Sequence, residues 1–262
     1  MYSKTQKALA EMLGTAALVL IGPGSVVATL VLAGKAVPAV TAADLLGISF
    51  AFGLIITALV YAIGKVSGCH INPAVTFALA LTKKMEWREA PMYWAAQFVG
   101  AVIGAFAIWG VFGQRAITLG MGQTSYGDVT SMAAAAGAEF IGTALLMFAI
   151  LGIVDSKSPG DLAGIVIGGV VIAIIMAIGP ITGASLNPAR AFGPELISAI
   201  GGGATHWAQY IPVYLVPGFV GTAVATFTYD FLANPRVVET PIRRAVTEVD
   251  DVSRDLPAHA AH

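Results

Sequence analysis

Charged residues are scarce in this chain. They make up 11% of its 262 residues, whereas soluble domains carry about 25%. Hydrophobic residues make up 57%, so most of the chain has no face suited to water, which predicts that lipid surrounds it. The net charge of -1 offers no basic surface to nucleic acid. The single cysteine, Cys69, excludes a disulfide within the chain.

Six apolar segments are long enough to cross a bilayer as helices, which takes roughly 20 residues. They cover residues 8–33, 44–66, 91–113, 134–154, 162–181 and 207–232. Two further apolar stretches, 72–82 and 187–199, are too short to cross and are predicted to be re-entrant half-helices. We therefore expect an all-α polytopic membrane protein, with a membrane domain over residues 1–233 and a disordered cytoplasmic tail over residues 234–262.

The chain repeats itself in two halves, at about 8–113 and 134–232. The sequence AEMLGT at residues 10–15 opens the first span, and AEFIGT at residues 138–143 opens the fourth. An Asn-Pro-Ala triplet follows the second span and another follows the fifth. Because each half holds an odd number of spans, the two halves must have opposite topology. Such an inverted repeat predicts a site near the midplane, where the two short helices meet.

Lysine and arginine residues set the expected orientation. With six spans and one re-entrant segment from each side, most of them fall on one face: Lys4, Lys7, Lys65, Lys83, Lys84, Arg88, Lys157, Arg236, Arg243, Arg244 and Arg254. The other face has only Lys35 and Arg115, besides Arg190. Because basic residues accumulate on the cytoplasmic side, we expect both termini in the cytoplasm and the chain in a plasma or inner cell membrane.

The two Asn-Pro-Ala triplets are the most specific signal. Asparagine is a strong helix N-cap and proline suits the first helical position, so each triplet starts a helix. If the backbone fixes the side-chain oxygens of Asn72 and Asn187, their NH2 groups face a lumen as hydrogen-bond donors. The positive ends of both helix dipoles then oppose cations, including hydronium. One triplet alone would be an ordinary helix start, but two at equivalent places predict a pore lined by Asn72, Pro73, Ala74, Asn187, Pro188 and Ala189.

These motifs resemble the aquaporin and aquaglyceroporin family over residues 8–232, most specifically in SGCHINPAVT at 67–76 and TGASLNPARAFGP at 182–194. The resemblance implies a six-helix bundle with two half-helices, assembled as a homotetramer with one pore per subunit. It implies a passive channel for water and other small neutral solutes that excludes protons and ions. It implies no enzymatic activity, no cofactor and no metal.

The resemblance also implies a selectivity filter of four residues: Phe52, Ile175, Ala184 and Arg190. In the family, water channels typically have Phe, His and a small residue at the first three positions. Glycerol channels typically have an aromatic residue, Gly and another aromatic residue there. This chain matches neither and is most similar to archaeal aquaporins, so we expect a wider, more apolar filter that passes water, glycerol and small apolar gases. Ala191 and Glu195 depart from the glycerol-channel pattern, which has Asp and a basic residue there.

Two glutamates lie at equivalent positions in the halves. Glu11 and Glu139 could relay protons, since an intramembrane carboxylate is often functional. The resemblance instead implies that they accept hydrogen bonds from the loops leading to the half-helices, a supporting role that suits a proton-excluding pore. His70 is expected to line the cytoplasmic vestibule, with pH gating as the alternative.

Four other functions remain open at this stage. A glycerol-selective facilitator would differ only in its filter. An ion-coupled transporter also uses inverted repeats and broken helices, but it needs carboxylates at the midplane, where this chain has two neutral asparagines. An intramembrane enzyme would need a nucleophile with a matched base. A closed structural or adhesion protein would cause no osmotic swelling of cells that express it.

Overall fold

The computed structural model describes residues 2–34, 40–127 and 130–233. Within these ranges every regular element is helical. The chain divides after Tyr229, and of the second unit, Asp230–His262, the structure describes only the residues up to Ala233. The predicted tail over residues 234–262 lies outside the described residues, so that assignment stays a prediction.

In the described part of the chain, six helical segments have the length and hydropathy to cross a membrane, which confirms the predicted spans. Five are single helices: α1 (Lys4–Leu32), α2 (Ala42–Ser67), α4 (Ala90–Phe112), α6 (Met132–Ile153) and α7 (Ala163–Thr182). The sixth is interrupted, because α9 (Trp207–Gln209) continues through a π-helical segment, η4 (Tyr210–Leu215), into α10 (Val216–Ala233). Pro212 lies inside this segment and, because a proline removes a helix hydrogen bond, it is a sequence signal for the interruption. The predicted span over residues 207–232 took no account of this proline.

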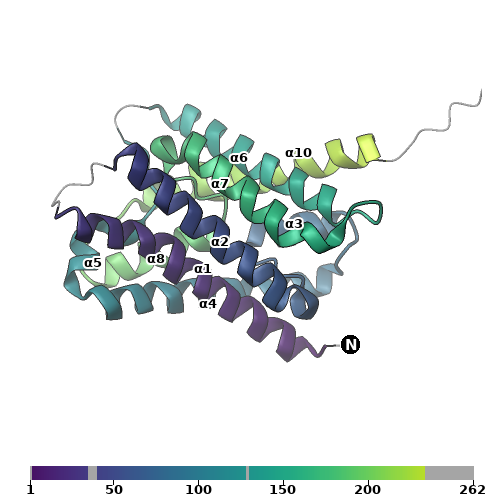
Figure 1. The fold of residues 1–262 in the computed structure, drawn as a ribbon, viewed down its shortest axis with the longest axis horizontal. Helices are drawn as coiled ribbons and strands as arrows, with labels where there is room; N and C mark the ends of the chain where they lie inside the picture. The colour runs from purple at the N-terminus through teal and green to yellow at the C-terminus, as the bar shows by residue number, and fades with distance from the viewer. Residues whose placement is uncertain (1, 35–39, 128–129, 234–262) are drawn as a thin grey trace, which may run out of the picture. The chain divides into compact units, whose positions relative to one another are not determined.

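The remaining elements are short. The predicted half-helices are α3 (Pro73–Leu81) and α8 (Pro188–Ile200), and they lie toward opposite ends of the bundle in Figure 1. One-turn helices η1 (Trp87–Glu89) and η3 (Gly160–Leu162) precede α4 and α7. After α4 the chain forms α5 (Gln114–Thr118) and a tight turn, η2 (Gly120–Gly122), which the sequence did not predict.

Local signals explain where the helices begin and end. Ser3 and Gln6 form a reciprocal capping box at the start of α1, and Thr41 and Asp44 form another at the start of α2. Helix α2 ends at Gly68, whose φ of 91° lies in the left-handed region that glycine adopts without steric cost. These two helices therefore begin where side chains satisfy their terminal N–H groups, and α2 ends where the backbone can turn away.

Helices α2 and α7 pack backbone against backbone. A Cβ atom added to Gly53 would lie 2.6 Å from the carbonyl oxygen of Gly168, closer than real Cβ contacts come. One added to Gly168 would overlap the side chain of Thr57 and the backbone of Gly53. Thr57 uses this proximity, because its hydroxyl donates to the carbonyl oxygen of Gly164 at 3.0 Å. Small residues thus allow the close helix contact that stabilises bundles in lipid.

We expect Gly168→Ala to destabilise the protein by about 1–3 kcal/mol, the usual cost of overpacking. Gly169 is the matched control, since it neighbours Gly168 in α7 and an added Cβ would meet open space. Gly169→Ala should be neutral or stabilising by about 0.5–1 kcal/mol, because alanine is the better helix former. Thermal unfolding of the two variants in detergent measures the difference, and equal midpoints would contradict the close packing.

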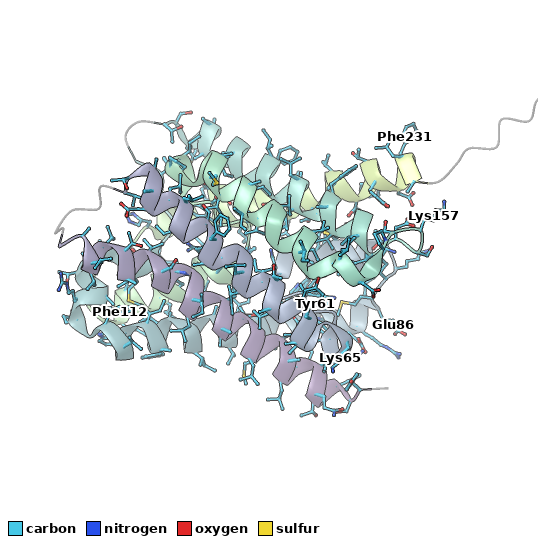
Figure 2. The ribbon with its side chains drawn as sticks, in the orientation of Figure 1. Tyr61, Lys65, Glu86, Phe112, Lys157 and Phe231 are labelled. Atoms are coloured by element: carbon cyan, nitrogen blue, oxygen red, sulfur yellow. The ribbon has the colours of Figure 1, made fainter. Side chains whose placement is uncertain are left out.

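The surface suits lipid along the helices and water at one end. Large apolar side chains stand exposed on the helices, among them Leu13 and Ile103. Lys65, Glu86 and Lys157 lie together at one end of the described bundle, away from Phe112 (Figure 2). This division is the one a bilayer imposes, with charged groups kept outside its hydrocarbon core.

Candidate functional site

The two half-helices begin with asparagines that are tied to each other's loops. Each Asn side-chain oxygen caps its own helix, accepting from Ala74 N at 2.9 Å and from Ala189 N at 3.0 Å. Asn72 Nδ2 donates to the carbonyl oxygen of Leu186 at 2.7 Å, and Asn187 Nδ2 donates to that of Ile71 at 2.8 Å. Each amide thus keeps one further N–H for a ligand, because an NH2 group carries two donors.

The loops that enter the half-helices share one strained conformation. Ile71 and Leu186, which precede the two asparagines, have positive φ of 43° and 55°. Cys69 and Ala184, two residues earlier, have φ of 51° and 43°. Left-handed backbone is costly for residues with side chains, above all for β-branched Ile71, so surrounding contacts must hold it in place.

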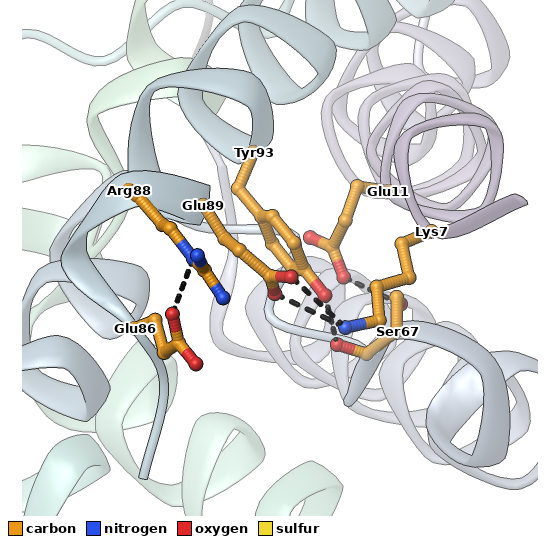
Figure 3. A network of polar contacts seen from close by, with 7 residues as sticks. All are labelled: Lys7, Glu11, Ser67, Glu86, Arg88, Glu89 and Tyr93. Atoms are coloured by element: carbon orange, nitrogen blue, oxygen red, sulfur yellow. Dashed lines mark hydrogen bonds and ion pairs between the residues drawn. The ribbon is translucent and has the colours of Figure 1, made fainter. Parts of the chain in front are cut away.

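Glu11 supplies those contacts in the first half. Its carboxylate accepts from His70 N at 2.9 Å, Ile71 N at 2.6 Å and Ser67 Oγ at 2.6 Å. A fourth donor, Gln97 Nε2, lies 2.8 Å away. Figure 3 shows Glu11 facing Ser67, whose carbonyl oxygen accepts in turn from the Tyr93 hydroxyl at 2.7 Å. A carboxylate with no exposed surface is acceptable here because four donors surround it.

Glu139 makes the same arrangement in the second half. It accepts from Thr182 Oγ1 at 2.6 Å and from the backbone N–H groups of Ser185 and Leu186, each at 2.8 Å. Tyr214 is equivalent to Tyr93, because its hydroxyl donates to the carbonyl oxygen of Thr182 at 3.0 Å. The inverted repeat is therefore visible in individual hydrogen bonds.

One cavity lies beside these asparagines and a second one adjoins it. A narrow one of about 100 Å³ runs along Asn72 and Asn187, and its wall is otherwise mostly apolar: Leu18, Ile56, Val60, Val75, Leu79, Leu146, Ile150, Val154, Ile167 and Val171. A wide one of about 720 Å³ opens beyond it. Phe52, Ile175 and Arg190 line both cavities, so they mark the junction, whereas Ala184 lines the narrow cavity only. A water molecule needs about 10–15 Å³ of such space, so the narrow cavity can hold a short file of them.

Arg190 brings a charge to this junction. Its Nη1 donates to the carbonyl oxygen of Gly122 at 3.0 Å, and its Cζ lies 5.2 Å from the centre of the Phe52 ring. Its Nε is buried and has no partner among the described residues. A buried donor without a protein partner needs an explanation, and a water or solute bound at this junction would supply one.

Residues 1–229 match the family of major intrinsic proteins. Aquaporin AqpM of Methanothermobacter marburgensis is 42% identical over 246 residues, which cover 89% of this chain and 100% of the relative. Aquaporin NIP1-2 of Oryza sativa subsp. japonica is 35% identical over 241 residues, covering 90% of this chain and 73% of the relative. The aquaglyceroporin structure from Plasmodium falciparum matches with a TM-score of 0.74 and 28% identity, covering 93% of this chain and 100% of that one. The chain belongs to the major intrinsic protein family.

This membership confirms the resemblance found in the sequence and sets the functional class. The protein is a passive membrane channel for water and small solutes and is not an enzyme. Coupled transport and a closed adhesion role find no support in these relatives.

In this channel the two halves differ in the side chains that flank their asparagines. The His70 ring lines the narrow cavity, packs 4.8 Å from the Tyr93 ring, and shares a 3.1 Å hydrogen bond with Thr76 Oγ1. Gln97 Nε2 donates to the same hydroxyl at 2.9 Å. In the second half, Ser185 and Ala191 occupy the positions of His70 and Thr76 relative to the asparagine. Besides the two asparagines, the halves thus line the narrow cavity with different polar side chains, His70 in the first and Ser185 and Arg190 in the second.

Several site residues escaped the sequence reasoning. The carbonyl groups of Ile71, Leu186 and Gly122 matter through their backbone, which a residue's type does not reveal. Gln97 sits in the middle of an apolar span and was not singled out. Its lone polar character among apolar neighbours was the available signal, because a buried polar side chain in a membrane helix needs a reason.

The loop after α6 begins at Val154, which lines the narrow cavity. There the backbone N–H of Lys157 donates to Asp155 Oδ1 at 2.9 Å and holds the pKa of that carboxyl below its usual range. The Tyr229 hydroxyl donates to Asp155 Oδ2 at 3.2 Å. Asp155 thus stays ionised, and its two hydrogen bonds tie this loop to Tyr229.

Proposed function

We propose that solutes cross this channel in single file past Asn72 and Asn187 and are selected by a filter of Phe52, Ile175, Ala184 and Arg190. The observation that carries the proposal is the junction of the two cavities, where three of these residues line both. A filter belongs where the path is narrowest and charge is present. Stopped-flow measurement of water, glycerol and proton fluxes in proteoliposomes tests the assignment.

The proposed path discriminates against protons as well as ions. Both asparagines hold a donor toward a passing water, so that water accepts from each side and cannot relay a proton through the pair. The positive ends of α3 and α8 meet at the same place, and the Arg190 charge adds to them. Glu11 and Glu139 then support the loops instead of relaying protons, because their oxygens are already occupied by donors.

The proposed filter favours small neutral solutes over strict water selectivity. Ile175 and Ala184 contribute no hydrogen-bonding side chain, and Phe52 adds an aromatic face. A solute therefore meets one polar side, at Arg190, and an apolar remainder. Glycerol has both kinds of surface and fits this division, and small apolar gases cross the apolar part without losing hydrogen bonds.

We expect Ile175→His to lower glycerol permeability more than water permeability. Histidine adds a polar ring to the lumen. The ring narrows the path and offers a hydrogen bond that water can use but the carbon backbone of glycerol cannot. Ile175→Leu is the matched control, since it keeps the apolar character and the volume, and both fluxes should stay near the unchanged level. Proteoliposomes with equal protein content provide the comparison, and equal losses of both fluxes in Ile175→His would remove Ile175 from the filter.

A glycerol-selective facilitator is the second candidate, favoured by the likeness to an aquaglyceroporin structure. Ala191 and Glu195 argue against it, because they replace the acid and the base found in glycerol channels. Glu195 is instead buried and accepts from the backbone N–H of His206. Slow water flux combined with fast glycerol flux in the unsubstituted protein would favour this candidate.

We also propose a homotetramer in the plasma or inner cell membrane, with both termini in the cytoplasm. Lys65 and Lys157 lie toward the same end of the bundle (Figure 2), and the charges of Lys157 and Lys84 both help to lower the pKa of Asp155, which supports the orientation. Basic residues that gather at one end mark the cytoplasmic side. Protease access to the chain's ends in sealed cells tests the orientation, and native mass measurement tests the assembly.

A further inference from the structure

Arg190 is almost fully buried, yet its charged group has few polar partners. Its guanidinium makes one hydrogen bond to the described residues, from Nη1 to the carbonyl oxygen of Gly122 at 3.0 Å. The Phe52 ring limits it on one side, at 5.2 Å from Cζ. Packing confines the buried side chain, and this single charge-assisted hydrogen bond then sets the direction of its guanidinium. The position of the Gly122 carbonyl therefore sets the position of the charge.

Gly122 ends a turn with an unusual backbone. Gly120, Met121 and Gly122 have φ of 80°, 55° and 65°, so three consecutive residues lie in the left-handed region. Met121 carries a side chain there and is fully buried. Such strain persists only where surrounding structure enforces it, and it gathers at functional sites.

Helix α1 is the structure that enforces it. A Cβ atom added to Gly122 would lie 2.8 Å from both the carbonyl carbon and the Cα of Pro23, and would overlap the Pro23 carbonyl oxygen. Real Cβ atoms essentially never come that close, and the atoms in the way are backbone, which cannot move aside as a flexible side chain can. Gly122 thus rests directly on α1, with its bare Cα against the backbone of Pro23.

We propose that Gly122 is a positioning residue for the filter. Its missing side chain lets the turn seat on α1 at Pro23, and this seat holds the carbonyl that orients Arg190. Residues in a loop and in the first span would then set selectivity through Arg190. The inference rests on the proposed filter function of Arg190, so the test includes Arg190→Ala as a separate arm.

Gly122→Ala should displace the turn and release the guanidinium. We expect the glycerol-to-water permeability ratio and the proton leak of proteoliposomes to change by about tenfold, the scale of one lost charge-assisted hydrogen bond. Gly120→Ala is the matched control. It replaces a glycine of the same turn with positive φ, but the nearest atom to an added Cβ is Gln123 Oε1 at 4.0 Å. Gly120→Ala introduces a similar backbone strain without the clash with Pro23. It should therefore leave the glycerol-to-water permeability ratio and the proton leak unchanged.

A double substitution separates positioning from general damage. If Gly122 acts through Arg190, then Gly122→Ala should cause no further change in selectivity once Arg190→Ala is present. Additive effects would overturn the inference, as would unchanged selectivity in Gly122→Ala or an equal change in Gly120→Ala. An Arg190→Ala variant with unaltered selectivity would overturn the filter itself.

If Gly122→Ala does not fold, Pro23→Ala replaces it in the same scheme. Removing the ring restores the helix hydrogen bond that proline prevents and shifts the backbone of α1 under the turn. The selectivity change should have the same direction and again vanish beside Arg190→Ala. A folded Pro23→Ala channel with unchanged selectivity would count against the seat on α1.

Discussion

Arg190→Ala is expected to raise the proton leak of the channel by about a hundredfold. The guanidinium stands at the junction of the two cavities. At about 5 Å and an effective dielectric constant of about 20, a unit charge opposes a passing cation by about 3 kcal/mol. Losing that opposition corresponds to about two factors of ten in rate. Proton flux into proteoliposomes that contain a pH-sensitive dye measures the change.

The leak should nevertheless stay far below that of an open ion pore. The starts of α3 and α8 keep their dipoles, and Asn72 and Asn187 keep their donors. Arg190→Lys should restore most of the cation barrier, since it keeps the charge, although it loses the planar fork. Arg115→Ala is the matched control on an exposed arginine outside both cavities and should leave the leak unchanged. An Arg190→Ala channel with an unchanged proton leak would contradict the electrostatic part of the proposed filter.

Glu139→Leu is expected to prevent formation of a functional channel. The substitution removes the acceptor of three buried donors: the Thr182 hydroxyl and the N–H groups of Ser185 and Leu186. Each buried donor left without a partner costs about 1–3 kcal/mol, so the loss approaches the whole stability of a typical protein. Thermal unfolding in detergent and water flux in proteoliposomes measure the two consequences.

Glu139→Gln keeps the shape of the side chain and one accepting oxygen. Its NH2 group, however, faces a donor, so we expect an intermediate loss of stability. Ile141→Ala is the matched control in α6, two residues away, on a side chain that is exposed on the helix surface. It should unfold near the temperature of the unsubstituted protein. A stable, water-conducting Glu139→Leu channel would show that the loop holds its strained conformation without the carboxylate.

The two halves share their supports but differ in their polar content. Glu11 has a fourth donor, Gln97, which also binds the hydroxyl of Thr76. Gln97 Oε1 remains buried with no partner among the described residues. Repetition of the backbone hydrogen bonds fixes the two half-helices alike, and the side chains then make the channel lining unequal. An inverted repeat in the fold therefore does not require a symmetric path.

Much of the fold could be predicted because lipid leaves few choices. Within a bilayer each backbone group must find a partner inside the protein, so long apolar segments form helices. The start of each half-helix could also be predicted, since Asn72 and Asn187 cap the helices that begin at Pro73 and Pro188. The π-helical segment at Tyr210–Leu215 was not predicted, although Pro212 lies within it, because a proline indicates an irregular helix without specifying which irregularity forms.

The sequence by itself determined the six spans, the two half-helix starts and the residues that carry charge or polarity in the membrane. Only the tertiary structure decided their partners. Asn72 bonds a carbonyl 114 residues away and Arg190 one 68 residues away, and in both pairs the acceptor is backbone. Helix starts depend on neighbours along the chain, so residue types reveal them. Which carbonyl reaches which side chain depends on how closely helices pack, and that distance is set by the whole bundle.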